Sequence, residues 1–566
     1  MDKKIKTLFT FLIASFSYGV AGTSEYTIPY MDFNEEAYST TAKPSYSKYI
    51  TYEDYGAKGN GTDDDAEAIY AAHEAANASN LPVKAKAGKK YLIKKANNKT
   101  AIINTDTEWT GAEFIIDDSE LSSPKERKQI FSVRDEYSLS PIVLIDNQNA
   151  GGSSEYSEII SKGLKKDATS IGAAIPAKSI LWLENKDVIR FRRCQSGKAT
   201  EQPAQEDLIV VDKNGNIDKG TPLNWSYDAF SQLYCKPIKQ TTLYLTGGTF
   251  TTIVNKCNST TYVAGGIEVL RSNVVIDKIN HKLQNEGTSA DYSAPYYGIF
   301  YLKQCAYITI KNCTVSSHIT YANRSGTYDI FPYEVAYLTL QNCHENTNLC
   351  DYSRWGVIGS NFCKNVRIID SELSRFDAHK GVTHAYIKNS TIGWAGINVI
   401  GEGTLMIEDS KCYGSNFVRL REDFGSTWHG NIYVKNCDWY LNRSDGKGIS
   451  SSMACIIGGN HICNFDFGYD CYMPKKIVID GFRVHDEAKG RNYYGPYLLN
   501  PFIDSSKDVF DSLKDKYPYH LTEDIYFKDY KSTSSEYQHY FGVSSNSDKL
   551  FEDVVVHSSW SSSEEK

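Results

Sequence analysis

A strand followed by Asn or Asp and then by Cys or Ser recurs six times in the chain, and this repeat restricts the possible folds more than any other feature. The copies are YITIKNC (307–313), YLTLQNC (337–343), VRIIDS (366–371), AYIKNS (385–390), LMIEDS (405–410) and NIYVKNC (431–437). Their Asn or Asp therefore returns at positions 312, 342, 370, 389, 409 and 436. One strand and one turn residue at such intervals predict the coils of a parallel β-solenoid.

Equivalent side chains of neighbouring coils should lie above one another, because stacked strands are about 4.8 Å apart. We therefore expect one column of turn residues made of Asn312, Asn342, Asp370, Asn389, Asp409 and Asn436. The residues that follow them should point inward as small fillers, namely Cys313, Cys343, Ser371, Ser390, Ser410 and Cys437. We interpret these cysteines as reduced core residues rather than metal ligands, because free Cys packs as a small hydrophobe.

A second distinctive stretch, DYGAKGNGTDDDAEAI, occupies residues 54–69. Its three consecutive aspartates suggest a calcium site, but the alternating ligands and later Glu of a calcium-binding loop are absent. The preferred interpretation is a helix start, with Thr62 or Asp63 as the cap and a helix running to about residue 80. Ile69, Ala72 and Ala76 would form its small apolar face.

This stretch, followed by VKAKAGKKYLIKK (83–95), resembles the N-terminal signature of the pectate-lyase-like right-handed β-helix superfamily. The resemblance implies an all-β, right-handed, single-stranded parallel β-helix over residues 48–485, with a capping α-helix at its N-terminal end. It also implies a secreted carbohydrate-active protein, since the superfamily includes polysaccharide lyases, glycoside hydrolases and phage tailspikes. The segment 158–187 resembles a β-rich insertion of these enzymes, which we place near residues 150–245. Residues 486–566 form a C-terminal region with a polar tail.

The start of the chain predicts export. Residues 1–21 combine three lysines, a short apolar run and small residues, as in a secretory signal peptide. Residues 22–47 would then be an N-terminal extension, and no later apolar run is long enough for a membrane span. We expect a periplasmic or extracellular protein. A net charge of −8 argues against a nucleic-acid partner.

Function in a solenoid lies on outward side chains and loops, because the interior is apolar. Counting forward by the same number of positions from Ser371, Ser390 and Ser410 leads to the starts of three successive strands. On this register we predict that His379 lies over Asn398, with Arg419 or Arg421 one coil further. The expected catalytic residues are Arg375, Asp377, His379, Lys380 and Arg421. The residues expected to bind substrate around them are Asp351, Arg354, Trp355, Trp394, Asn398, Arg419 and Asp423.

Arginines beside a histidine favour a lyase that cleaves a uronate-containing polysaccharide, such as a glycosaminoglycan, by β-elimination. Arg375 or Arg421 would neutralise the substrate carboxylate, His379 would act as base, and Lys380 or a tyrosine as acid. One alternative is a glycoside hydrolase using Asp377 with Asp423 or Asp351. Another is a glycan-binding solenoid without catalysis. No motif indicates a metal, Ca²⁺ included, or another cofactor, and the oligomeric state is open.

Overall fold

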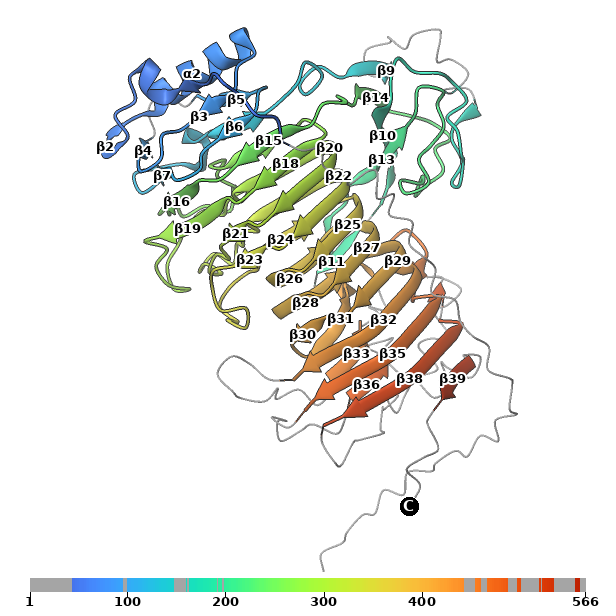
Figure 1. The fold of residues 1–566 in the computed structure, drawn as a ribbon. Coiled ribbons are helices and arrows are strands. Elements are labelled where there is room, and N and C mark those ends of the chain that lie inside the picture. Colours follow the sequence, from blue (N-terminus) through green and yellow to red (C-terminus); the bar gives the residue numbers. More distant parts are fainter. Residues whose placement is uncertain are drawn as a thin grey trace, which may run out of the picture. The chain divides into compact units, whose positions relative to one another are not determined.

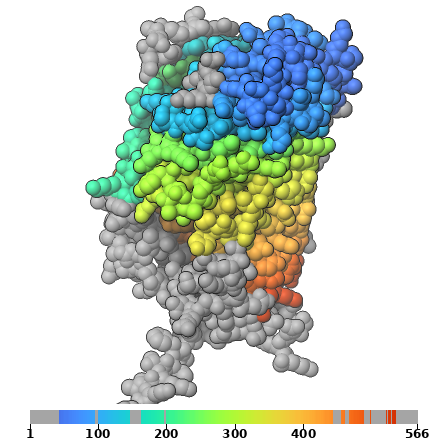
Figure 2. All heavy atoms as spheres, turned by 90° about the vertical axis from the view of Figure 1, so that its left-hand side faces the viewer, coloured from blue at the N-terminus to red at the C-terminus, as the bar shows by residue number. Residues whose placement is uncertain are grey.

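Three stacks of parallel strands form the solenoid, and successive coils follow one another along its axis as bands of changing colour (Figure 2). The computed structural model describes residues 43–94, 99–146, 159, 162–190, 192–195, 198–441, 454–459, 466–486, 496–499, 519–520, 522–533 and 555–559.

The stack that carries the candidate site, called the site stack, is labelled along the solenoid in Figure 1. In pairing order it contains β5 (Ala101–Ile103), β8 (Phe131–Val133), β17 (Ile267–Val269), the first parts of β20 (Phe300–Lys311) and β22 (Ile330–Gln341), β24 (Ile358–Ser360), β26 (Glu372–Ala378), β28 (Thr391–Val399), β31 (Asn416–Leu420), β33 (Ala454–Gly458) and β36 (Pro496–Leu499).

The second stack holds the repeated strands identified in the sequence. It contains β1 (Ile50–Thr51), β3 (Val83–Lys84), β6 (Thr107–Glu108), β15 (Leu243–Thr246), β18 (Val274–Asp277), the later parts of β20 and β22, β25 (Cys363–Ile369), β27 (Val382–Lys388), β29 (Gly401–Glu408), β32 (Trp428–Tyr440), β35 (Lys476–His485), β38 (Asp524–Ser532) and β39 (Val555–Ser559). Parallel pairing therefore continues beyond residue 485, where the solenoid was expected to end, because the strands β38 and β39 add further coils.

The third stack follows the bend after the second. It contains β2 (Asn60–Asp64), β4 (Lys90–Ile93), β7 (Glu113–Asp117), β16 (Thr249–Ile253), β19 (Asn280–Gln284), β21 (Thr314–Val315), β23 (His344–Glu345), the first parts of β26 and β28, β30 (Lys411–Tyr413) and the end of β32. Outside the stacks, β34 (Cys471–Tyr472) pairs with β37 (Tyr519–His520), and short 3₁₀ helices cover Tyr52–Tyr55, Pro124–Glu126 and Glu422–Phe424.

The predicted column of Asn and Asp residues forms the bend between the second and third stacks. All six residues have positive φ, between 46° and 53°, a left-handed conformation that Asn and Asp tolerate better than most residues. The Asn342 amide donates to Asn312 Oδ1 at 2.8 Å, and the Asn389 amide donates to Asp370 Oδ1 at 2.8 Å. Their backbone N–H groups bond to the following coil, for example Asn312 to Gln341 O at 2.9 Å. The stacking prediction is confirmed.

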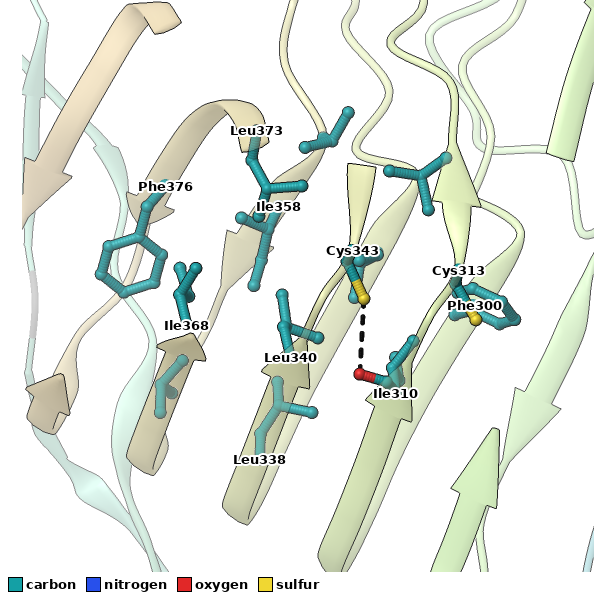
Figure 3. Packing of buried hydrophobic residues seen from close by; sticks show 14 of the residues in the cluster. Phe300, Ile310, Cys313, Leu338, Leu340, Cys343, Ile358, Ile368, Leu373 and Phe376 are labelled. Carbon is teal, nitrogen blue, oxygen red and sulfur yellow. Dashed lines mark hydrogen bonds between the residues drawn. The ribbon is translucent and has the colours of Figure 1, made fainter. Parts of the chain in front are cut away.

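The small residues after each bend point into the core, as predicted. Cys313, Cys343 and Cys437 are fully buried and carry free thiols (Figure 3 shows the first two). Cys343 Sγ lies 3.4 Å from the Ile310 carbonyl oxygen. In the shorter coils the Ser390 hydroxyl donates to its own strand at Lys388 O, 2.7 Å away, and accepts from the Ser371 N–H at 3.1 Å. Cys and Ser are therefore equivalent fillers of one column.

The helix near the N-terminus is α2 (Ala66–Ser79), and its Ile69, Ala72 and Ala76 join the solenoid core as predicted. It lies at one end of the stacked strands (Figure 1). Its first residue follows Asp65, so the prediction that Thr62 or Asp63 caps it is wrong. Those two residues are held instead by the Asn60 side chain, which accepts hydrogen bonds from both of their N–H groups at 3.0 Å.

An antiparallel sheet with its own core interrupts the solenoid, and we call it the inserted subdomain. Its strands are β9 (Ile142–Asp146), β10 (Ser179–Ile189), β13 (Ala204–Val211) and β14 (Gln232–Pro237), and a hairpin of β11 (Arg193–Gln195) and β12 (Lys198–Glu201) extends from it. It docks against the second stack. There Lys364 pairs with Asp207 at 2.6 Å, and each side chain is only 1% exposed.

Candidate functional site

The outward positions of the site stack place several predicted residues in one row. Asp377 pairs in register with Asn398, and Asn398 pairs with Arg419. The prediction that His379 lies over Asn398 is therefore wrong.

The cause of this error is a bulge in β28. Leu373 pairs with Ile392, whereas Arg375 pairs with Gly396, so β28 advances further along its length than β26 between these two pairs. The additional residues of β28 move Asn398 away from His379 and place it beside Asp377. Counting from the serine column could not reveal the bulge.

Asp377 is the centre of the site, although its side chain is fully buried. Arg375 Nη2 lies 2.7 Å from its Oδ2, Arg421 Nη1 lies 2.7 Å from its Oδ1, and the Tyr328 hydroxyl donates to it. Burial alone would raise the pKa of Asp377, but the two guanidinium groups outweigh it and hold the pKa far below its ordinary value. Asp377 therefore stays ionised and orients two arginines instead of donating a proton.

A chain of ion pairs connects this centre to the inserted subdomain. Arg421 also binds Asp423, whose Oδ2 lies 2.8 Å from Arg193 Nε on β11. Arg193 in turn pairs with Glu201 on β12 at 2.8 Å, and Glu201 pairs with Lys380 at 2.9 Å. Opposite charges outweigh the effect of burial at both acids, so the pKa values of Asp423 and Glu201 are lowered. The hairpin β11–β12 thus forms part of the site.

His379 is half-buried and lies beside this chain of ion pairs. Its Nδ1 lies 3.2 Å from Asn361 Oδ1, so Nδ1 donates and Nε2 keeps its lone pair. The ring meets Phe424 edge-on, with the ring centroids 6.0 Å apart. Burial is the largest influence on the imidazole and lowers the pKa of His379 to about 4, although Asp377 opposes this shift. The imidazole is therefore neutral near pH 7.

The other predicted binding residues divide into two groups. Trp355 contacts the site: Arg375 lies over its ring at 5.2 Å and donates to its carbonyl oxygen at 3.1 Å. Its neighbour Arg354 instead pairs with Asp351 at 3.1 Å and with Glu286 at 3.4 Å, within the loops beside the site.

Three further predicted residues make contacts of their own outside the ion-pair cluster. The Asn398 amide donates to Ala395 O on its own strand at 2.7 Å, although its position lies next to Asp377. Arg419 is exposed and pairs with Glu422. Trp394 packs against the hydrophobic core.

The residues that the sequence did not reveal are Tyr328, Asn361, Arg193 and Glu201. Asn361 could have been found by extending the strand register by one residue. Ser360 pairs with Ala378, so the residues that follow them, Asn361 and His379, lie side by side. Arg193 and Glu201 lie far before their partners in the sequence, on a hairpin of the inserted subdomain. No local pattern marks them.

Within the described residues there is no group of three or more His, Cys, Asp or Glu side chains that could hold a metal ion. None of the helices described is both long and apolar enough to cross a membrane.

Comparison with models of known protein families gives no match, and comparison with curated proteins gives none either. Solved structures do match. The tailspike gp61 of Pseudomonas phage phi297 is 13% identical, with 90% of this chain and 83% of that chain covered and a TM-score of 0.46. The adhesin PfbA of Streptococcus pneumoniae is 10% identical, with coverages of 86% and 89% and a TM-score of 0.36.

A third match is the A-module of the mannuronan C-5 epimerase AlgE4 of Azotobacter vinelandii, 12% identical, with coverages of 86% and 88% and a TM-score of 0.31. At these identities and TM-scores the matches add nothing to what the strand pairing shows, and the chemistry has to come from the site. By its own strand pairing, the chain is a parallel β-helix protein with an inserted antiparallel subdomain.

Proposed function

We propose that the protein is an exported enzyme that cleaves a uronate-containing polysaccharide by β-elimination at the ion-pair cluster around His379. The observation that carries this proposal is the protonation state of the side chains that could give or take a proton. His379 is a neutral base among cations, whereas the nearby carboxyl groups Asp377, Asp423 and Glu201 are all paired with cations and have lowered pKa values. A site of this kind suits proton abstraction.

In the proposed reaction, His379 Nε2 removes the proton from the carbon next to the uronate carboxylate. The electron pair of that C–H bond forms a C=C double bond as the glycosidic C–O bond breaks, and the leaving oxygen takes a proton from the Lys380 ammonium group. The cations make the proton more acidic by binding the carboxylate. The Lys380 and Arg375 side chains are 25% and 16% exposed, against 10% for Arg421. Lys380 and Arg375 therefore meet the substrate, and Arg421 holds the cluster together.

Hydrolysis is less well supported by the same cluster. A glycoside hydrolase needs one protonated carboxylic acid with a raised pKa beside a second carboxylate. Asp351, like Asp377 and Asp423, has a lowered pKa, because hydrogen bonds from Ser353 and the charge of Arg354 outweigh its burial. None of the predicted carboxyl pairs therefore supplies a general acid.

The test is a panel of acidic polysaccharides incubated with the purified protein. Elimination yields an unsaturated uronate that absorbs in the near ultraviolet, whereas hydrolysis yields new reducing ends without this absorbance. We expect absorbance with at least one polysaccharide, and its loss in His379→Ala. Arg483→Ala is the matched control, since that exposed arginine on β35 pairs with Asp438 on β32, outside the site stack. Reducing ends without absorbance would exclude the lyase.

A further inference from the structure

A group of aromatic rings continues the row of the ion-pair cluster along the site stack. Tyr301 and Phe331 pair in register at the outward positions of β20 and β22. Tyr262 and Tyr297 lie against them from the neighbouring loop segments, and all four side chains are half-buried. We call these four residues the aromatic platform. Three of the rings are close to parallel: Tyr301 and Tyr262 make angles of 18° and 12° with Phe331.

A fifth ring connects the aromatic platform to the cluster. Tyr328 is tilted only 2° from Phe331, with ring centroids 6.3 Å apart, and its hydroxyl binds Asp377. Its ring lies over Gly359, where an added Cβ would come within 2.5 Å of it. Gly359 is the register partner of Asp377 and thus leaves the room for this ring. Tyr328 and Asp377 are themselves buried, so they join the aromatic platform to the ion pairs from beneath the surface.

The two ends of this row carry different charged groups. At the cluster end, Arg375 lies over the Tyr328 ring at 5.6 Å and over Trp355. At the other end, Tyr301 pairs in register with Glu268, whose charge is balanced by Arg134 and which also accepts a hydrogen bond from Ser132. The faces of aromatic rings are themselves negative, so they repel a carboxylate and favour C–H groups.

We infer that the aromatic platform binds the uncharged face of a pyranose ring that precedes or follows the acidic residue held by the cluster. The substrate would then be a mixed glycan in which neutral sugars alternate with uronates, not a polymer of uronate alone. Phe331 and Asp377 are two coils apart, about 10 Å by strand spacing, which is the scale of a disaccharide. This inference rests on the proposed function for the binding of the acidic sugar, and it adds a binding site for the neutral sugar next to it.

Calorimetric titration with two defined probes tests the inference. One probe is a hexasaccharide of alternating glucuronate and N-acetylglucosamine, and the other is a hexasaccharide of galacturonate alone. All variants carry His379→Ala, so that the probes are not consumed. We expect tighter binding of the alternating probe, and a loss of about tenfold in affinity for Tyr301→Ala and for Phe331→Ala.

Two further variants separate ring contact from general damage. Tyr301→Phe keeps the ring face and should keep the affinity. Tyr413→Ala removes a half-buried tyrosine that stacks on Tyr440 elsewhere and should leave binding unchanged. Unchanged affinity in Tyr301→Ala and Phe331→Ala, tighter binding of the galacturonate probe, or binding of neither probe would overturn the inference.

The same materials distinguish this inference from the proposed function. If the lyase proposal fails, the protein with His379 intact yields no unsaturated product, while binding still depends on the aromatic platform. If the inference fails, product can still form, but affinity does not depend on Tyr301 or Phe331.

Discussion

At the scale of single residues, the protonation state of each side chain in the cluster follows from the charged groups around it and from its burial. Asp377 is buried with two guanidinium groups and keeps its charge. His379 is half-buried with an amide oxygen at Nδ1, and because burial lowers its pKa the imidazole loses its charge. Near neutral pH, Asp377 therefore stays ionised, whereas the neighbouring His379 stays neutral.

His379→Ala should lower turnover by roughly 10²–10⁴-fold, the usual effect of removing one proton-transfer group. The pH profile adds a sharper test. A base works when deprotonated, so kcat/KM of the native enzyme should fall only as pH drops toward about 4, the lowered pKa of His379. An ordinary histidine would cause the fall near pH 6.5. A fall near 6.5, or near-native turnover of the variant, would remove His379 as the base.

Arg421→Lys keeps the positive charge but removes the fork that binds Asp377 and Asp423 together. We expect activity to fall by about tenfold or more, because a charged hydrogen bond contributes about 1.5–3 kcal/mol. Circular dichroism should show an intact fold, since the side chain points away from the core. Arg419→Lys is the control at an exposed pair, and equal activities of the two variants would contradict the role of Arg421.

At the scale of elements, the sequence predicts the coils of the solenoid, but it gives no sign of the bulge in β28. A bend that needs a left-handed backbone conformation favours Asn or Asp. The bends between the second and third stacks therefore appear in the sequence as a regular repeat of these residues. The bend before the second stack uses the same conformation at Tyr307, Tyr337 and His384, and the two tyrosines are not typical residues for it. Their side chains pack on the inserted subdomain or a neighbouring strand, so tertiary contacts override local preference there.

Ser390→Trp should prevent folding or lower the free energy of unfolding by at least about 3 kcal/mol, because Ser390 is buried in a column that holds only Ser and Cys side chains. Ser390→Cys is the matched control. Cysteine already fills this column in three other coils, so the change should cost less than about 1.5 kcal/mol. Urea unfolding measures both. A well-folded Trp variant would show that the column is not packed as described.

Helix α2 carries His73 inside the core, where Tyr52 contacts Nε2 at 3.0 Å. Burial lowers the pKa of His73 to about 3. Between pH 6.5 and 3 the unfolded chain binds a proton there that the folded protein does not, so stability should fall as pH falls. From pH 6.5 to 5 this group accounts for about 2 kcal/mol.

His73→Leu should remove the contribution of this histidine to the pH dependence of the free energy of unfolding. Midpoints of urea unfolding at the same two pH values measure it. His344→Leu, at a histidine that is 45% exposed, should leave the dependence as it is. An unchanged slope in His73→Leu would show that the histidine is not held neutral.

At the scale of the whole molecule, the inserted subdomain is fixed to the solenoid by charges that water cannot reach. Lys364 and Asp207 are each 1% exposed, and Lys364 also donates to the Pro222 carbonyl oxygen. Through the hairpin β11–β12, the same subdomain supplies Arg193 and Glu201 to the cluster. The sequence could indicate that an insertion exists, but its contacts depend on three-dimensional docking that leaves no periodic signal.

Lys364→Met should leave Asp207 buried without its cation, held only by the backbone N–H groups of Leu208 and Asn224, and weaken docking by roughly 3–5 kcal/mol. We expect faster proteolysis within the inserted subdomain and reduced activity, because Arg193 and Glu201 would lose their position. Lys165→Met is the control, since its pair with Asp228 is exposed and worth little. Equal protease resistance of the two variants would indicate that the subdomain is held by other contacts.

The column of bends also bears on how a chain of this kind can change its length. The bend residues are joined in side-chain pairs, and their backbone N–H groups bond to the next coil. The shortest coils run from Asp370 to Asn389 and from Asn389 to Asp409. Deleting or duplicating a segment between two such bends would bring matching residues together again, with inward and outward positions still in phase. Gene rearrangements could therefore add or remove one whole coil at a time, and the hydrogen-bonded column would close over the junction.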